Sequence, residues 1–218
     1  MKLKRSYKIV LSVIVGMALF MAVIGHFSKQ TTTKRDLKVE ATQKKIKKVA
    51  PKNTPTTVQD DKQMVGLKNF KYTDPSEKKD YPDLSKYPHA WIDVDLATQR
   101  TYIKDGTTTL YEMYSSTGRH DTTPRGTYYI QNERGEFFYT EPLKMGAYYW
   151  VSFLNHGEYL FHTTPTDVTG KYDEEIAKTL GREPSSHGCV HLSIADCKWI
   201  YDNVPTGMKV VIHGKYQA

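Results

Sequence analysis

The segment EPSSHGCVHLS, residues Glu183–Ser193, brings two histidines and a glycine together with one of only two cysteines in the 218-residue chain. This density of reactive side chains fits three kinds of site: a metal centre, one half of a disulfide, or a nucleophilic cysteine. Gly188 weakens a strand, and a helix cap follows at Ser193. The segment is therefore predicted to be a turn that leads into a helix.

The helix after this turn is expected over residues 193–204, SIADCKWIYDNV. Ser193 and Asp196 have the spacing of a capping box, with Asp in place of the usual Glu or Gln. Cys197 lies on the apolar face of this helix, where a thiol behaves as a small hydrophobic group. A disulfide needs Cα atoms within about 7 Å. A helix that runs away from Cys189 disfavours that pairing, so Cys197 is predicted to be a buried core residue.

A metal site would use His187, Cys189 and His191, with His162 completing a tetrahedral set. A turn would point these side chains in different directions, so we expect no metal and no other cofactor. The nucleophile interpretation needs an activated thiol, because a free cysteine has a pKa near 8.5 and is mostly protonated at neutral pH. Free amides at the start of the helix supply a positive field, and Gly188 lets the backbone approach a substrate.

Upstream of the motif the sequence alternates between apolar and polar residues, which is typical of strands. The first strand is expected at 90–100, followed by a strand pair at 101–114 that turns at Asp105-Gly106. Five more strands are expected at 126–130, 136–140, 147–153, 158–162 and 208–213. A short helix fits 173–181 and ends at Gly181. These patterns predict a mainly β, mostly antiparallel domain with a helix near its end.

The sequence SSHGCVHLS resembles the [S/T]-H-G-C signature of the L,D-transpeptidase catalytic domain (YkuD-type), whose members cross-link bacterial peptidoglycan through a cysteine. The resemblance extends over AWIDVDLATQRTYIKDG, YSSTGRHDTTPRGTYYI, GEYLFHTTP and PTGMKVVIH, in the order expected for the family. It implies an antiparallel β-sandwich or barrel-like fold, with one helix after the cysteine motif and a short helix in an insertion.

The resemblance also implies roles for individual residues. Cys189 matches the nucleophile and His162 the general base, with the Thr163 carbonyl orienting the imidazole. The amides of His187 and Gly188 match the oxyanion pocket. Stem-peptide contacts are expected from four residues: Ser186, His191, Tyr149 and Trp150.

Two features depart from the family pattern. His162 and Cys189 are 27 positions apart, a longer gap than the family usually has. The insertion covers residues 163–185 and contains the acidic segment YDEEIAKTLGRE, which is interpreted as a lid or a surface helix. His191 stands where the family usually has Arg or Asn, which weakens any transfer of substrate contacts to this position.

The N-terminal residues predict export. Residues 1–27 combine four Lys/Arg with an apolar run at 9–25, as in a membrane anchor or signal peptide, and orient the rest of the chain outside the cytoplasm. Residues 28–87 are rich in Lys and Thr and are predicted to be a flexible stalk that could attract anionic lipid or wall polymers. Residues 88–215 form the predicted catalytic domain.

The charge distribution argues against a nucleic-acid partner. The net charge is +7 overall, yet residues 88–218 carry twelve Lys/Arg against sixteen Asp/Glu. The expected partners are therefore peptidoglycan stem peptides, reached from outside the cytoplasmic membrane.

The expected reaction begins with attack of Cys189 on the carbonyl of the third stem residue. D-alanine leaves, and the side-chain amine of another stem takes the acyl group, which forms a 3→3 cross-link. Two alternatives stay open at this stage. A carboxypeptidase or endopeptidase would use the same site with water as acceptor, and a non-catalytic wall-binding module would not react at all.

Overall fold

The computed structural model describes residues 63–217, so the expected anchor or signal peptide at 1–27 and the stalk segment 28–62 lie outside the described residues. The strands are β1 (Ala90–Asp95), β2 (Arg100–Asp105), β3 (Thr108–Ser116), β4 (Gly126–Tyr129), β5 (Arg134–Thr140), β6 (Met145–Leu154), β7 (Tyr159–Thr163), β8 (Val190–Leu192) and β9 (Lys209–His213). The α-helices are α2 (Glu174–Ala177) and α3 (Ile194–Asn203), and short 3₁₀ turns are η1 (Leu84–Lys86), η2 (Arg119–Asp121) and η3 (Glu141–Leu143).

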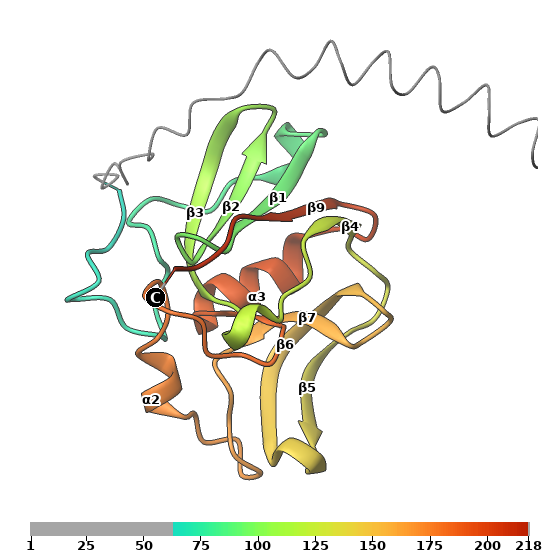
Figure 1. Cartoon of the computed structure of the whole chain (residues 1–218). Helices are drawn as coiled ribbons and strands as arrows, with labels where there is room; N and C mark the ends of the chain where they lie inside the picture. The colour runs from blue at the N-terminus through green and yellow to red at the C-terminus, as the bar shows by residue number, and fades with distance from the viewer. Residues whose placement is uncertain (1–62, 218) are drawn as a thin grey trace, which may run out of the picture. The chain divides into compact units, whose positions relative to one another are not determined.

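The strands form one nine-stranded curled sheet in the order β4-β9-β1-β2-β3-β8-β7-β6-β5 (Figure 1). Most neighbours are antiparallel, but β1 pairs with β9 and β7 pairs with β8 in parallel. The mainly β prediction is confirmed. The expected strand pair turns at Asp105-Gly106 as predicted, because Gly106 has a φ of +56°. The short strand β8 is a correction, since the motif was predicted to pass directly from turn to helix.

Alternation along the strands produces the core. Ile92 and Val94 on β1, Ile103 on β2 and Val210 on β9 are fully buried and pack in one cluster. Val151 and Phe153 on β6 and Phe161 on β7 belong to the same cluster. Burial of each such side chain stabilises the fold by about 1.5–3 kcal/mol. The core therefore joins both halves of the curled sheet.

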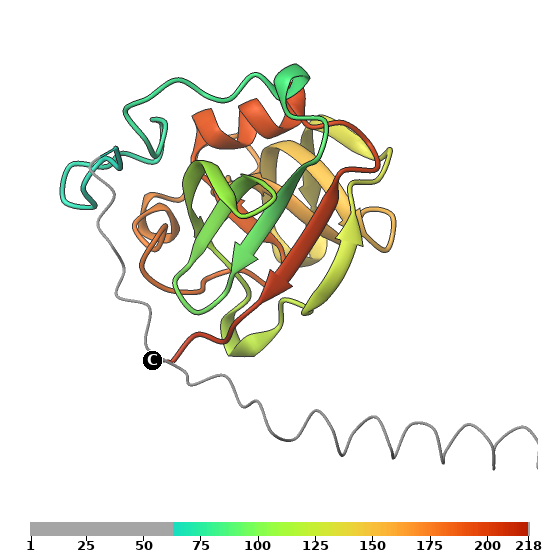
Figure 2. The same cartoon turned by 90° about the horizontal axis from the view of Figure 1, so that it is seen from above.

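Helix α3 lies between these halves and contacts β6 and β7 (Figures 1 and 2). Ser193 is its N-cap, and its hydroxyl accepts a hydrogen bond from the Asp196 amide at 3.1 Å. Cys197 and Ile200 are completely buried, and Cys197 carries a free thiol, as the sequence predicted. The end of β8 and the start of α3 are thus fixed together directly after Cys189.

Residues 63–87, here named the strap, differ from the predicted flexible stalk. The strap lies against the sheet and α3, with Met64, Ser76 and Glu77 buried. The buried Asp196 carboxylate accepts hydrogen bonds from the Ser76 hydroxyl at 2.6 Å and from the Tyr81 hydroxyl at 2.7 Å. These bonds satisfy a charge that would otherwise be costly inside the protein. The boundary at residue 88 is therefore wrong, because the folded part already includes residues 63–87.

Ser76 offers a test of the strap. Its hydroxyl donates to Asp196 and accepts from the Tyr114 amide at 2.8 Å. We expect Ser76→Ala to lower the free energy of unfolding by about 1–3 kcal/mol, since two buried groups each lose one hydrogen bond. Urea denaturation of the full chain measures this change. The exposed Ser85→Ala is the control and should stay within about 0.5 kcal/mol. Equal stability of both variants would mean that the strap does not hold α3.

The predicted short helix begins at the expected place, in the insertion between β7 and β8. Asp173 caps α2 by accepting from the amides of Glu175 and Ile176, both at 3.0 Å. The helix ends at Ala177, earlier than the Gly181 stop that the sequence suggested. Among residues 63–217, no helix is long and apolar enough to cross a membrane.

Candidate active site

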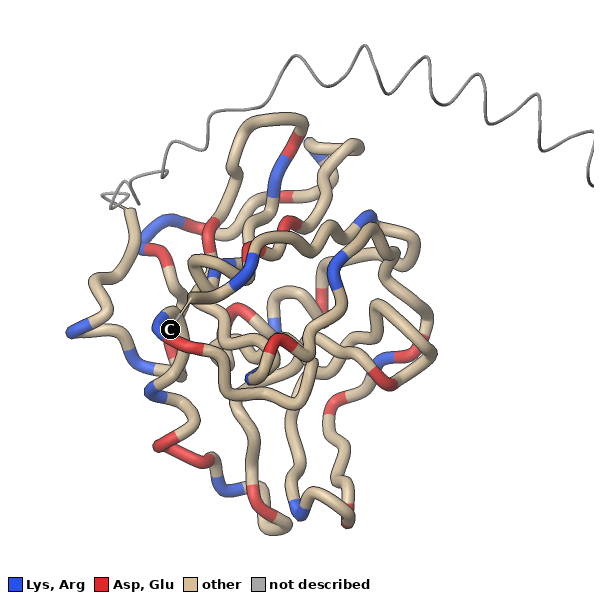
Figure 3. The backbone as a smooth tube through the Cα atoms, viewed as in Figure 1, with Lys and Arg blue, Asp and Glu red and all other residues tan. Residues whose placement is uncertain are grey.

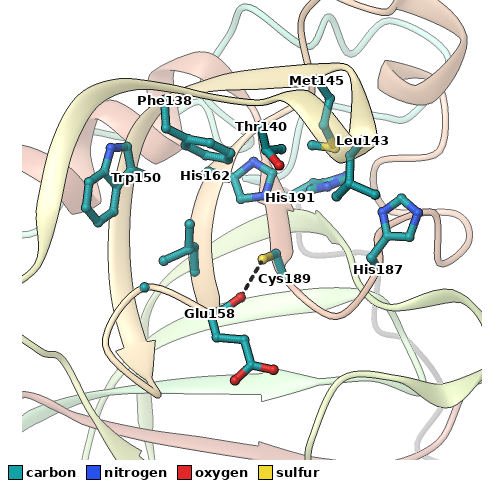
Figure 4. Close-up of a pocket in the computed structure, with 12 residues that line it drawn as sticks. Phe138, Thr140, Leu143, Met145, Trp150, Glu158, His162, His187, Cys189 and His191 are labelled. Atoms are coloured by element: carbon teal, nitrogen blue, oxygen red, sulfur yellow. Dashed lines mark hydrogen bonds between the residues drawn. The ribbon is translucent and has the colours of Figure 1, made fainter.

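A cavity of about 370 Å³ lies beside β5, β6 and β7 and opens over Cys189 (Figure 4). Apolar side chains form most of its wall, and the reactive groups gather at one end. Its lining residues are Phe138, Thr140, Leu143, Met145, Trp150, Gly157, Glu158, Leu160, His162, His187, Cys189 and His191. Three residues of the Cys189 motif, His187, Cys189 and His191, therefore share one cavity with His162 and Trp150, which were also singled out from the sequence.

Parallel pairing of β7 and β8 brings these residues together. Phe161 is opposite Val190 and His162 is opposite His191 in the register of the two strands. Cys189 immediately precedes β8, so the register places it beside the start of β7, near Leu160, despite the 27 positions that separate it from His162 in the sequence. Figure 4 shows the Cys189 side chain and the His162 ring facing the same space.

His162 is set up as a proton acceptor. Its Nδ1 lies 2.8 Å from the Thr163 carbonyl oxygen. A carbonyl can only accept, so Nδ1 carries the proton and Nε2 keeps its lone pair. The ring is 1% exposed, and burial lowers its pKa to about 4. The Thr163 carbonyl thus occupies the orienting place that the family resemblance implied, and the imidazole is neutral at physiological pH.

Cys189 is half-buried, and its thiol donates to the Glu158 carbonyl oxygen at 3.6 Å. Burial raises its pKa to about 11, with a smaller opposing effect from the Leu160 backbone amide. The thiol and the imidazole are therefore both neutral in the resting protein. Proton transfer to His162 requires the thiol to turn away from Glu158, a rearrangement that substrate binding often brings about.

The turn before Cys189 is held by hydrogen bonds of its own. Gly188 has a φ of +145°, and a Cβ there would come within 2.9 Å of the Tyr159 ring, so only glycine fits. Its amide donates to the Ser186 hydroxyl at 3.0 Å, and that hydroxyl donates to the Cys189 carbonyl at 2.6 Å. The Gly188 amide is thus engaged inside the turn, which argues against the oxyanion role expected for it. Ser186 is buried and shapes the turn; it does not line the cavity.

His187 and His191 occupy different places in the cavity. His187 is exposed at its rim, whereas His191 is 3% exposed and its ring centroid lies 4.7 Å from that of His162. Burial lowers the pKa of His191, and the nearby His162 adds to this effect. The Ser185 hydroxyl lies 3.4 Å from His191 Nδ1. His191 is therefore a second neutral imidazole beside the general-base candidate.

The aromatic pair on β6 separates in the structure. Trp150 lines the cavity, whereas Tyr149 packs against α3, with its ring centroid 5.8 Å from that of Tyr201. The Lys198 ammonium also lies 5.3 Å from the centre of the Tyr149 ring. The two side chains therefore lie in different surroundings and do not form one platform. Tyr149 is not among the residues that line the cavity, and the predicted substrate contacts at Tyr149 and Trp150 both stay predictions.

Several cavity residues were not identified from the sequence. Phe138 packs edge-on against the His162 ring at 5.5 Å, and the other missed side chains on the hairpin wall are Thr140, Leu143 and Met145. The alternation of EFFYT could have suggested that Phe138 and Thr140 share a face. The Glu158 contact uses a backbone oxygen, for which a sequence has no signal.

Within residues 63–217, no group of three or more His, Cys, Asp or Glu side chains has an arrangement suited to hold a metal ion. The cysteines in this part of the chain are both free. Cys189 and His162 line the same cavity as a thiol and an imidazole that are both uncharged.

Comparison with known proteins identifies the family. The sequence profile of the YkuD L,D-transpeptidase catalytic domain matches residues 89–212. The chain belongs to this L,D-transpeptidase family. A relative in Bacillus subtilis (strain 168), YciB, whose name describes a candidate L,D-transpeptidase, is 44% identical over 166 residues, which cover 73% of this chain and 84% of the relative.

Solved L,D-transpeptidases are also similar to this chain. One from Mycobacterium smegmatis is 18% identical with a TM-score of 0.48, and the match covers 58% of this chain and 59% of that one. One from Mycobacterium tuberculosis H37Rv is 20% identical with a TM-score of 0.47, covering 57% of each chain. The strap, residues 63–87, precedes the YkuD match, which begins at residue 89.

Proposed function

We propose that this L,D-transpeptidase-family chain forms 3→3 cross-links between peptidoglycan stem peptides through a Cys189 thioester. The observation that carries the proposal is the shared cavity, in which a half-buried thiol faces an imidazole whose Nδ1 proton is fixed by the Thr163 carbonyl. That tautomer leaves Nε2 able to take the thiol proton.

In the first half-reaction, the Cys189 proton passes to His162 Nε2 while Sγ attacks the carbonyl carbon of the third stem residue. The bond to the terminal D-alanine nitrogen then breaks, and that amine takes the proton from His162. The products are a thioester on Cys189 and free D-alanine. General acid–base catalysis of this kind contributes about 10²–10⁴-fold to the rate.

In the second half-reaction, the side-chain amine of another stem attacks the thioester carbonyl. Its proton goes to His162 and then returns to the departing sulfur, which restores the thiol. A thioester favours amines over water more than an oxygen ester does. The apolar wall formed by Phe138, Leu143 and Leu160 supports this outcome by limiting the water around the acyl group.

Incubation of the full chain with purified disaccharide tetrapeptides tests the proposed reaction. We expect free D-alanine and cross-linked dimers, identified by mass spectrometry as 3→3 linked. Tripeptides without dimers would replace the proposal with a carboxypeptidase that uses water. Unchanged tetrapeptide would favour a non-catalytic wall-binding module.

The location of the protein is part of the same proposal. The apolar run at 9–25 would anchor the chain in the membrane or direct its secretion, and the basic residues before it would stay inside. Residues 28–62 would then act as the stalk, with the catalytic domain on the wall side. Stem peptides are substrates that such a position makes accessible.

A further inference from the structure

A second cavity, here named the strap groove, lies between the strap and α2. Its volume is about 420 Å³, and it shares no lining residue with the active-site cavity. The residues that line it are Leu67, Lys68, Phe70, Lys71, Tyr72, Thr73, Glu174, Ala177, Lys178, Leu180 and Arg182. Its walls come from the packed strap and from the long insertion, the two segments that depart most from the sequence expectations.

Positive charge dominates the lining of the strap groove. Four cations, Lys68, Lys71, Lys178 and Arg182, line it with a single carboxylate, Glu174. Figure 3 shows basic segments along the strap and beside α2 on the same side of the domain. Four positive groups around one cavity favour an anionic ligand.

The cations differ in how far they are already engaged. Lys178 pairs with Glu175 at 2.6 Å, and Arg182 donates to the Leu67 carbonyl at 2.9 Å, which ties the insertion to the strap. Lys68 and Lys71 are exposed and form no ion pair within residues 63–217. These two ammonium groups are therefore free to bind a ligand without breaking an existing pair.

The floor of the strap groove is apolar and aromatic. The Phe70 ring packs edge-on against Tyr114 at 4.7 Å, and the Tyr72 ring lies 5.6 Å from that of Tyr172. Both rings are half-buried and line the cavity together with the buried Leu180. A floor of this kind, with a charged rim, suits a ligand that has apolar ring faces as well as negative groups.

We propose that the strap groove binds a linear anionic saccharide. The sugar rings would lie on Phe70 and Tyr72, and the negative groups would pair with Lys68 and Lys71. The chain itself does not supply a matching occupant in its N-terminal segment, because residues 28–62 carry ten Lys/Arg against four Asp/Glu and would be repelled. The same basic segment would add to the attraction of an extended polyanion.

Binding of a fluorescent oligogalacturonate to the full chain in detergent micelles tests this site. We expect Lys68→Gln together with Lys71→Gln to raise Kd by about fivefold or more, and higher salt to reduce the difference. The matched control removes two lysines from the β9 side, Lys209→Gln with Lys215→Gln, and should change Kd by less than about twofold. Equal loss in both double variants, or no loss in either, would overturn the proposal.

Two comparison ligands test the chemistry. A neutral maltooligosaccharide of equal length should bind at least about tenfold more weakly, because it lacks the charges. Inorganic polyphosphate should bind more weakly than oligogalacturonate at equal charge. Tighter or equal binding would overturn the saccharide assignment, because the site would then recognise negative charge and not sugar rings. D-alanine release from tetrapeptide should be unchanged in the Lys68/Lys71 variant, which separates failure of this proposal from failure of the proposed function.

Discussion

Replacing Cys189 with alanine is expected to lower D-alanine release and dimer formation by at least about 10³-fold. The reason is that the thiol is the only nucleophile proposed for the acyl transfer, and it is the cysteine that lines the active-site cavity. Intact-mass measurement gives a second readout. Wild-type protein incubated with a carbapenem should gain one covalent adduct, and the alanine variant should gain none.

The control for this substitution is Cys197→Ser. Cys197 is fully buried in α3, and its thiol donates to the Tyr149 carbonyl at 3.2 Å, a bond that a hydroxyl can replace. We expect this variant to keep its activity and its adduct, with a change in stability of about 1 kcal/mol. An adduct that persisted in Cys189→Ala and disappeared in Cys197→Ser would show that Cys197, and not Cys189, is the reactive cysteine.

The second large effect is expected from His162→Gln, which should lower the rate of acylation by about 10²–10⁴-fold. Glutamine fills much of the imidazole volume but cannot accept and release the thiol proton. His213→Gln is the matched control. His213 lies on β9, its Nε2 is 2.8 Å from Asp93 Oδ1, and it does not line the cavity. Single-turnover formation of the adduct measures the step; a rate equal to that of wild type would remove His162 from the mechanism.

The pH dependence of the wild-type enzyme provides a further readout of His162. Since its pKa is lowered to about 4, the neutral base predominates above that pH, and activity should fall as the pH drops through about 4. The unfolded chain binds this proton already near its ordinary pKa of about 6.5, so stability also declines as the pH falls between these values. Circular dichroism at each pH separates loss of fold from loss of the base. An acid limb near 7 in a folded enzyme would contradict a buried, neutral imidazole.

Sequence patterns predicted the parts of the fold that depend on local periodicity. The apolar alternation at Ile92 and Val94 marks β1, and the Ser193 cap with the apolar face of Cys197 marks α3. The motif around Cys189 also indicated the nucleophile, because its residues are adjacent in the chain. His162 could be assigned only through the family resemblance, since its proximity arises from the pairing of β7 with β8.

The remaining differences arise from interactions that have no local pattern. Hydrogen bonds from Ser76 and Tyr81 to Asp196 help to hold the strap, and these partners lie more than a hundred positions apart in sequence. Tyr149 has a φ of +55°, a backbone irregularity that composition does not reveal. The engagement of the Gly188 amide by Ser186 likewise depends on how the turn closes.

The parallel pairing of β7 with β8 makes the geometry of the active site independent of the length of the segment that connects these two strands. Because the chain leaves the sheet at Thr163 and re-enters it at Val190, any excursion between these points returns to the same register. Loop closure becomes only slowly more costly with length, so this crossover can be enlarged with little effect on the position of Cys189 relative to His162. An accessory module can therefore be added or lost there over evolution while the chemistry is inherited unchanged.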